Sequence, residues 1–359
     1  MTVFSAPAWD QHELVAFGSD RASGLRAIIA VHDTTLGQGV GGCRMFPYAS
    51  DEEALHDVLR LSRGMTFKSA LAGLPMGGGK SVIIGDSRRD KTPALLRAMG
   101  DFVHSQGGRY VAAEDSGTGV ADIRLMAERT PHVSGMNDNE FGGDPSPSTA
   151  YGVFLGIRTA VRHRLGVDSC AGLRVAVQGL GHVGYHLARH LLDDGATVYG
   201  ADVNEGNLRR AVDELGVLPV AADEILALEV DILAPCAMGA VLNDRSISAL
   251  RAGIVAGAAN NQLATAEDCA RLQDHGILYC PDFLINAGGI IDVHHQRVGS
   301  ADAVKRSHIE RIELTLAEVL QRADTTRQPT QEIAEDLARE YLRSAPGLKV
   351  APLPLQAAG

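Results

Sequence analysis

The stretch VAVQGLGHVG, residues 175–184, decides the fold of this chain of 359 residues. An apolar run of the kind that forms a buried strand leads directly into glycines at positions 179, 181 and 184. A helical pattern of apolar residues follows, and a second strand-like run ends at Asp202, about 20 residues after the glycines. This order of strand, glycine-rich turn, helix and strand predicts a βαβ unit of a parallel sheet.

Each position of the glycine-rich turn has a mechanical role if a dinucleotide binds there. Gly179 permits the tight turn, Gly181 lets a pyrophosphate approach the backbone, and Gly184 lets the helix pack closely on the strand. The backbone N–H groups of His182–Val183 begin the helix and can bind phosphate oxygens. Asp202 would accept hydrogen bonds from the adenosine ribose and repel a 2′-phosphate, which favours NAD over NADP. The alternative is a tight turn without a ligand, and a dinucleotide site alone does not identify a substrate.

The second half of the chain continues the alternation of strands and helices. Strand-like runs occupy 174–178, 197–201, 231–234, 254–258 and 277–280. Such alternation predicts an α/β fold with a doubly wound parallel sheet. Two amphipathic helices follow, with apolar residues at 309, 312, 316, 319 and 320 in the first and at 333, 337 and 341 in the second.

The first half also alternates strands with helices, in a less regular order. Strand-like runs occupy 26–31, 80–84 and 109–113. Ser50 is the expected N-cap of one helix and Gly64 its expected end, while Thr92 begins a second helix.

Composition indicates where the domains meet. Residues 136–149 are rich in Asn, Asp, Gly, Pro and Ser, which is typical of a loop. We therefore expect an N-terminal α/β substrate-binding and catalytic domain over 1–135 and a Rossmann-type NAD-binding domain over 136–327. The helix over 328–343 is expected to pack back on the first domain, and the segment 344–359 to be disordered.

The overall charge and composition argue against several classes of function. The formal net charge of −11 disfavours nucleic acid as a partner, because an acidic surface repels phosphates. No apolar run approaches the ~18 residues that would suggest a membrane span, and the N-terminus has no signal-peptide pattern. The five cysteines are scattered without a C-x-x-C pair, so neither a disulfide framework nor a metal site is indicated. A soluble cytoplasmic protein is the expectation.

A second group of chemically capable residues lies in the first half. Lys68 ends the run GMTFK, Lys80 closes the run GGGK, and Asp115 follows a predicted strand. Two ammonium groups and a carboxylate suit an amino-acid substrate, because one lysine can pair with the substrate carboxylate, the other can act as a base, and the aspartate can move protons. A loop of glycines would give a ligand room beside Lys80. The alternatives are that both lysines are solvated surface residues and that Asp115 only caps a strand end.

Taken together, these residues resemble the family of glutamate, leucine, valine and phenylalanine dehydrogenases, and within it most closely the leucine, valine and phenylalanine branch. The resemblance covers residues 10–343. It is carried by the runs IIAVHDTTL (28–36), GGCRMF (41–46), EEALHDVLRLSRGMTFK (52–68), GGGKSVIIGD (77–86), DPSPSTAYGV (144–153), APCAMG (234–239), GAANNQL (257–263) and NAGG (286–289).

The resemblance implies an NAD-dependent amino-acid dehydrogenase with a substrate domain, a Rossmann domain and a cleft between them that closes. It implies that Lys68 binds the substrate α-carboxylate, that Lys80 activates water, and that Asp115 handles protons at the substrate amine. Asn261, with Asn260 beside it, would lie near the substrate or the nicotinamide. The resemblance also implies a homo-oligomer.

One position bears on the pocket for the substrate side chain. Glutamate members of the family carry a lysine directly before the paired glycines, where this chain has Val40 before Gly41. A buried valine cannot balance a carboxylate, whose desolvation is costly. The resemblance therefore implies an apolar substrate such as leucine, valine, isoleucine or phenylalanine, with tryptophan as an alternative. Pockets distinguish single methylenes by only about 1–3 kcal/mol, so the sequence does not select among them.

Three segments depart from the family pattern. Gln38 replaces a common proline, Gly119 a common threonine, and the run HHQ at 294–296 a usual Ala-Asp-Glu run that helps to form the pocket. Adjacent histidines on a helix do not face one site, which argues against a metal there. The competing hypotheses are a 2-hydroxy-acid dehydrogenase, which would show a histidine with an arginine clamp, a catalytically silent NAD-binding regulator, and a glutamate-specific enzyme, which Val40 opposes.

Overall fold

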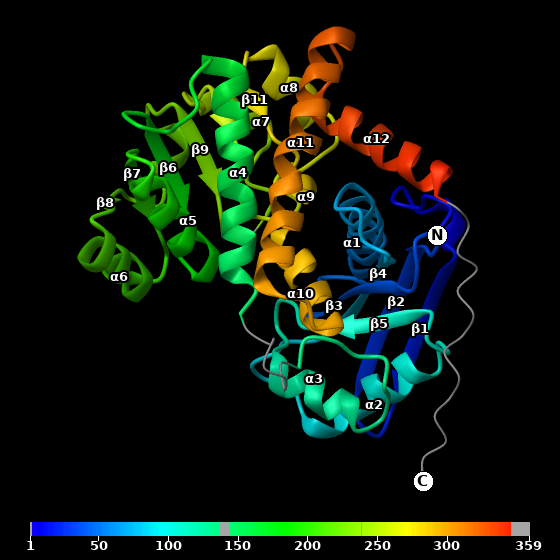
Figure 1. Ribbon diagram of the computed structural model, residues 1–359. Coiled ribbons are helices and arrows are strands. Elements are labelled where there is room, and N and C mark those ends of the chain that lie inside the picture. The colour runs from blue at the N-terminus through cyan, green and yellow to red at the C-terminus, as the bar shows by residue number, and fades with distance from the viewer. Residues whose placement is uncertain (1, 137–143, 238, 346–359) are drawn as a thin grey trace. The chain divides into compact units, whose positions relative to one another are not determined.

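The computed structural model describes residues 2–136, 144–237 and 239–345 (Figure 1). Contacts divide the chain into two units. Unit 1 comprises Met1–Gly143 and Ala338–Gly359, and unit 2 comprises Asp144–Leu337. The segment expected to be disordered, 344–359, lies outside the described residues from 346 onward.

Unit 1 is built on a mixed sheet with strand order β1-β2-β4-β3-β5. Its strands are β1 Leu14–Asp20, β2 Leu25–Asp33, β3 Gly39–Phe46, β4 Gly77–Ile84 and β5 Tyr110–Ala113. Strand β2 pairs antiparallel with β1 and β4, whereas β3 pairs parallel with β4 and β5. In this register the end of β5, at Ala113, is level with Gly42 in the middle of β3. Residues that follow β5 therefore lie alongside the second half of β3.

Helices cover both faces of this sheet. Helix α1 (Asp51–Leu71) lies on one face, and α2 (Pro93–His104) and α3 (Val120–Ala127) lie on the other (Figure 1). Alternate residues of β2 point to opposite faces, so Ile28 packs in a cluster with Leu59 of α1, while Ile29 packs in a cluster with Met99 of α2. Burial on both faces explains why β2 reads as a continuous apolar run.

Helix α1 is longer than the sequence predicts. Ser50 is its N-cap and accepts a hydrogen bond from the backbone N–H of Glu53, as expected. Gly64, the expected end, lies inside the helix, which continues to Leu71. A glycine in a helix interior costs only about 1 kcal/mol relative to alanine, and the buried residues on both sides of it favour continuation. As a result, Lys68 lies in the last turn of α1.

The glycines before Lys80 are not a loop, which corrects the prediction from sequence. Gly77, Gly78 and Gly79 are the first residues of strand β4. They are buried where neighbouring backbone approaches closely: a Cβ on Gly78 would stand 2.3 Å from the backbone nitrogen of Thr66 in α1. The glycine run therefore serves close packing of α1 and β3 on β4, and does not leave room for a ligand in a loop.

Unit 2 contains a parallel sheet with strand order β11-β10-β9-β6-β7-β8, which confirms the predicted doubly wound α/β fold. Its strands are β6 Arg174–Gln178, β7 Thr197–Ala201, β8 Leu218–Pro219, β9 Ile232–Pro235, β10 Ile254–Val255 and β11 Leu278–Tyr279. Its helices are α4 Ser146–Leu165, α5 His182–Asp193, α6 Glu205–Leu215, α7 Asp244–Ala249, α8 Asp268–Asp274, α9 Asp282–Ile285, α10 Gly288–Val298, α11 Asp302–Thr326 and most of α12 Thr330–Ser344.

Two long helices of unit 2 lie side by side in Figure 1, α4 and α11. Helix α4 begins at Ser146, so the predicted loop over 136–149 is helical in its last four residues, and 137–143 lie outside the described residues. Both predicted amphipathic helices are present as α11 and α12. Across the described part of the chain, every helix is too short or too polar to cross a lipid bilayer.

Candidate active site

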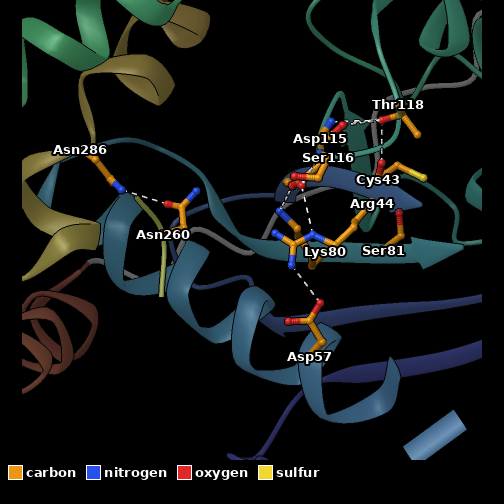
Figure 2. A network of polar contacts seen from close by, with 12 residues as sticks. Cys43, Arg44, Asp57, Lys80, Ser81, Asp115, Ser116, Thr118, Asn260 and Asn286 are labelled. Atoms are coloured by element: carbon orange, nitrogen blue, oxygen red, sulfur yellow. Dashed lines mark hydrogen bonds and ion pairs between the residues drawn. The ribbon is translucent and has the colours of Figure 1, made fainter. Parts of the chain in front are cut away.

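Lys80 and Asp115 form a buried ion pair in unit 1. Lys80 lies in the middle of β4 and is 6% exposed, and Asp115 lies two residues past the end of β5. The parallel register of β3 with both strands brings the two side chains together, and Figure 2 shows Lys80 directed at the Asp115 carboxylate. Both are residues that sequence reasoning selected, and neither is a solvated surface group.

The loop after β5 fixes the backbone of Asp115. The hydroxyl of Thr118 accepts a hydrogen bond from the Asp115 N–H at 3.1 Å and donates one to the carbonyl of Cys43 at 2.7 Å. The N–H of Ser116 donates to Asp115 Oδ1 at 2.6 Å. A Cβ on Gly42 would stand 2.5 Å from Asp115 Oδ2, so this glycine lets the carboxylate lie over β3.

Arg44 is a third charged group at this site. Its Nε donates to Asp115 Oδ1 at 3.2 Å, and its Nη1 donates to Asp57 Oδ2 of helix α1 at 2.9 Å (Figure 2). The Tyr48 hydroxyl donates to the same Asp57 oxygen at 2.6 Å. Arg44 belongs to the run GGCRMF, which carries the family resemblance, but the sequence assigned it no role. The only signal in the sequence is a cation among the glycines and apolar residues of that run.

These contacts determine the charge of Asp115. Burial alone would raise the pKa of its carboxyl group, but the Lys80 ammonium and then the Arg44 guanidinium outweigh burial and lower that pKa to about 2. Asp115 is therefore an anion at neutral pH, held between two cations in a site from which most water is excluded.

The other residues selected in the first half lie on elements next to this pair. Val40 is 5% exposed in β3, and Gly41 follows it. A Cβ on Gly41 would stand 1.8 Å from the carbonyl oxygen of Gly79, so only glycine allows β3 and β4 to pair here. Lys68 is half-buried in the last turn of α1, the helix that packs on β4.

The glycine-rich turn of unit 2 has the geometry expected of it. Gly179 has φ of +94°, a backbone conformation that favours glycine. A Cβ on Gly184 would stand 1.9 Å from the carbonyl oxygen of Gly179, which explains the close packing of helix and strand. At Gly181 no described atom lies within 4 Å of where a Cβ would stand. The turn is therefore open at Gly181, the position where a ligand is expected.

The remaining residues selected for the dinucleotide lie around this turn. His182 and Val183 form the first turn of α5, and His182 Nδ1 is 3.3 Å from Asp144 Oδ2. Asp202 lies directly after β7, and its Oδ2 accepts a hydrogen bond from the Leu180 N–H at 2.7 Å. This contact joins the ends of two neighbouring strands and holds the carboxylate beside the turn.

Asn260 and Asn261 lie after β10 in unit 2. Asn260 accepts a hydrogen bond from Asn286 Nδ2 at 2.9 Å (Figure 2). Asn261 has φ of +52°, the left-handed region that asparagine tolerates better than most residues. Its carbonyl accepts from the Ala240 N–H at 2.6 Å. The two asparagines thus have backbone and side-chain partners that fix their positions.

The three departures from the family pattern take part in local contacts. Gln38 donates to the Gly108 carbonyl at 2.7 Å, and Gly119 donates to Asp122 Oδ2 at 2.9 Å at the start of α3. His295 Nε2 lies 2.9 Å from His308 Nδ1 of α11. Within the described residues, no three or more His, Cys, Asp or Glu side chains are grouped so that they could hold a metal ion.

A parallel doubly wound sheet with an open glycine turn, in a chain that also carries a buried lysine–carboxylate pair, defines the class as a two-unit α/β dehydrogenase. The family model described as the dimerisation domain of Glu/Leu/Phe/Val dehydrogenases matches residues 12–132. The model described as Glutamate/Leucine/Phenylalanine/Valine dehydrogenase matches residues 144–212 and 204–334. The chain belongs to the Glu/Leu/Phe/Val dehydrogenase family and is an amino-acid dehydrogenase.

Individual relatives agree with this membership. A leucine dehydrogenase of Geobacillus stearothermophilus is 45% identical over 96% of this chain and 94% of its own length. A valine dehydrogenase of Streptomyces virginiae is 44% identical over 93% of this chain and 94% of its own. The crystal structure of an L-tryptophan dehydrogenase from Nostoc punctiforme superimposes with a TM-score of 0.80 at 40% identity, over 93% of this chain and 97% of that one.

Proposed function

We propose that this enzyme catalyses the reversible, NAD-dependent oxidative deamination of an L-amino acid with an apolar side chain, such as leucine, valine, isoleucine or phenylalanine. The products are the 2-oxo acid, ammonia and NADH. The observation that carries the proposal is the buried ion pair of Lys80 in β4 with Asp115 just after β5, the two strands that flank β3 and its buried Val40. Lys80 and Asp115 can exchange protons with an amine, and Val40 has no charge that could pair with a charged substrate side chain.

The glycine-rich turn of unit 2 fits NAD. The open position at Gly181 and the N-terminus of α5, including His182 and Val183, would hold the pyrophosphate. Asp202 would accept hydrogen bonds from the adenosine ribose and disfavour a 2′-phosphate, and Asn260 would lie near the nicotinamide. Bound NAD⁺ supplies an acceptor for the hydride that leaves the substrate Cα.

The residues of the chain then bind the substrate and move its protons. Lys68 pairs with the α-carboxylate and Asn261 holds the substrate in place. Asp115 takes a proton from the substrate ammonium, which leaves the amine from which a hydride can depart. Lys80 must first release its ammonium proton to solvent; after the iminium forms, the neutral Lys80 amine takes a proton from water, whose oxygen attacks the iminium carbon. Asp115 returns a proton to the nitrogen of the resulting carbinolamine and then takes the hydroxyl proton as ammonia leaves, which yields the 2-oxo acid.

The absence of a charge at position 40 favours a substrate with an apolar side chain. Val40 is buried and cannot pair with a distal carboxylate. A carboxylate moved from water to such a position would lose its hydration without a compensating partner. We therefore expect glutamate to be excluded and Val40, with Gly41 beside it, to contact the apolar side chain.

An aromatic substrate is a second candidate, because the L-tryptophan dehydrogenase named above shares 40% of its residues with this chain. The test is NADH formation, followed by absorbance, with purified protein, NAD⁺ and leucine, valine, isoleucine, phenylalanine, tryptophan, alanine or glutamate. Turnover with an apolar member and none with glutamate is the expected result. Binding of NAD without turnover on any amino acid would instead identify a catalytically silent regulator.

A further inference from the structure

The guanidinium of Arg44 is shared between two carboxylates. Its Nε faces Asp115 and its Nη1 faces Asp57, at 3.2 and 2.9 Å. The side chain is only 16% exposed. A planar fork with one edge on each carboxylate has a fixed orientation, because turning it toward one partner breaks the contact with the other.

The two Asp115 oxygens have different partners. Oδ2 is the oxygen that meets Lys80, and Oδ1 receives Arg44 Nε and the N–H of Ser116. A carboxylate can rotate about its bond to Cβ, and the contacts to Oδ1 prevent that rotation. Oδ2 is thereby kept facing Lys80, on the side where the proposed proton transfers take place.

Arg44 is held in turn from helix α1 and the loop before it. Asp57 Oδ2 accepts hydrogen bonds from Arg44 Nη1 and from the Tyr48 hydroxyl. Asp57 lies in the second turn of α1, the helix that ends with Lys68 in its last turn. A chain of contacts thus runs from a rigid helix through Asp57 and Arg44 to Asp115.

We propose that Arg44 is a positioning residue for Asp115: it holds the carboxylate ionised and turned with Oδ2 toward Lys80, and Asp57 anchors Arg44 for this task. The inference rests on the proposed function, in which Asp115 exchanges protons with the substrate amine. Arg44 itself touches neither substrate nor cofactor in this account.

The test compares Arg44→Met, Arg44→Lys and Asp57→Asn with the native enzyme, using NAD⁺ and the amino acid with the highest kcat/KM in the panel. We expect Arg44→Met to lower kcat about 100-fold, because small misplacement of a reacting group has effects of this size, with much less change in KM. Arg44→Lys restores the charge but not the fork, and Asp57→Asn weakens only the anchor. Both should lose about 10-fold.

The pH profile separates positioning from general structural support. The charged or titratable groups around Asp115 include Lys80 from β4, Arg44 and Cys43 from β3, Tyr110 from β5, and Tyr48 and Asp57 on the other side of Arg44. Burial raises the pKa of Cys43 to about 12 and that of Tyr110 far above its ordinary value, so neither titrates near neutrality. Loss of the Arg44 cation should raise the pKa of Asp115 and move the acid limb of the kcat profile to higher pH.

Matched variants distinguish the possible failures. Arg97→Met, which removes an exposed ion pair with Glu128 in the same unit, should leave kcat and the acid limb unchanged. NADH binding and circular dichroism check that each variant is folded. In an Asp115→Asn background, Arg44→Met should lower the residual kcat less than about threefold.

A native kcat in Asp115→Asn would show that Asp115 takes no part in the proposed proton transfers. An impaired Asp115→Asn together with a native kcat and acid limb in Arg44→Met would overturn the role of Arg44 alone. A full additional loss from Arg44→Met in the Asp115→Asn background would likewise overturn it. If Arg44→Met does not fold, Arg44→Lys and Asp57→Asn carry the test through kcat, and a native kcat in both beside an impaired Asp115→Asn would overturn the role of Arg44.

Discussion

Asp202 combines a structural contact with the proposed choice of cofactor. Its Oδ2 accepts from the Leu180 N–H and its Oδ1 from the Asn204 N–H, both at 2.7 Å. Oδ2 also accepts from Asn207 Nδ2 at 3.2 Å. Oδ1 keeps a second lone pair, so these contacts orient the group without exhausting it as an acceptor. A ribose hydroxyl can therefore still be bound, while the negative charge remains to repel a phosphate.

We expect Asp202→Asn to raise the ratio of kcat/KM with NADP to that with NAD about 10- to 100-fold, because a hydrogen bond to a charged group contributes about 1.5–3 kcal/mol. Steady-state kinetics with both cofactors measure the ratio. Asp213→Asn removes an exposed carboxylate of α6 in the same unit and should leave the ratio unchanged. An unchanged ratio in Asp202→Asn would show that another group discriminates between the cofactors.

His32 makes stability depend on pH. It is buried in β2, with Nδ1 2.9 Å from the Thr66 hydroxyl of α1. Burial, and then the neighbouring His12, lower its pKa from 6.5 to about 4. Between these values the unfolded chain binds a proton that the folded chain does not. Stability is therefore expected to fall as pH decreases through this range.

Thermal unfolding followed from about pH 8 down to about pH 5 measures this contribution. We expect His32→Asn to show a smaller loss of Tm on acidification than the native chain, whatever its Tm at the higher pH. His56→Asn removes an exposed histidine of α1 and should keep the native dependence. Identical acid dependence in His32→Asn and the native chain would contradict this assignment.

The chemical residues could be selected from the sequence, but their environment could not. Lys80 and Asp115 stand out because each adjoins a strand-like run and, with Lys68, suits an amino acid. Arg44 meets Asp115 across 71 positions of the chain, through a parallel strand pairing that no local pattern displays. The ionised state of Asp115 depends on that contact, so it too appears only in the folded chain.

At the scale of elements, helix α1 and strand β4 form the contact that positions Lys68 and Lys80. Gly64 of α1 and Gly78 of β4 differ sharply in their surroundings. No described atom lies within 4 Å of a Cβ on Gly64, whereas a Cβ on Gly78 would stand 2.0 Å from Thr66 Oγ1 and 2.3 Å from the Thr66 nitrogen.

We expect Gly64→Ala to raise the free energy of unfolding by about 0.5–1 kcal/mol, because alanine loses less backbone entropy in a helix. Gly78→Ala should lower it by about 3 kcal/mol, since the clash with backbone forces helix and strand apart. Urea unfolding of both variants provides the comparison. A destabilised Gly64→Ala would mean that Gly64 has a packing role that the structure does not reveal.

Strands and helices with regular apolar patterns were predictable. Strands β6 and β7 occupy the predicted ranges 174–178 and 197–201. Strand β3 was missed because the run GVGGCRMF has three glycines and no alternation, although close approach of β4 requires one of them, Gly41. Glycine signals a loop in a sequence and a tight contact in this sheet, and only the neighbouring strand distinguishes the two.

For the whole molecule, we propose a homo-oligomer, supported by the match of residues 12–132 to a family model described as a dimerisation domain. Sedimentation equilibrium at micromolar concentration should give a mass at least about twice that of one chain, as expected for a closed symmetric assembly. Kinetics measured across the same concentrations provide the control, because specific activity should fall only where the assembly dissociates. A stable, fully active monomer would contradict the proposal.

The order of strands in unit 1 was beyond prediction from one sequence. Alternating strands and helices favour parallel pairing, yet β1 and β2 are antiparallel to their neighbours while β3, β4 and β5 are parallel. Pairing partners are set by packing among segments that are distant in sequence. The parallel sheet of unit 2 could be predicted because each of its strands except the short β8 is followed by an α-helix.

Unit 1 is assembled from both ends of the chain, with unit 2 between them. Ala338 is fully buried, and the Arg339 guanidinium lies 3.9 Å from Asp10 and 5.1 Å from the ring centroid of Phe67. A ribosome that makes this chain releases the sheet of unit 1 first, but supplies Ala338 and Arg339 only after all of unit 2 has emerged. We therefore expect unit 2, which is continuous in sequence, to complete its fold before unit 1 does. This order is the reverse of the usual N-to-C order of domain folding during translation.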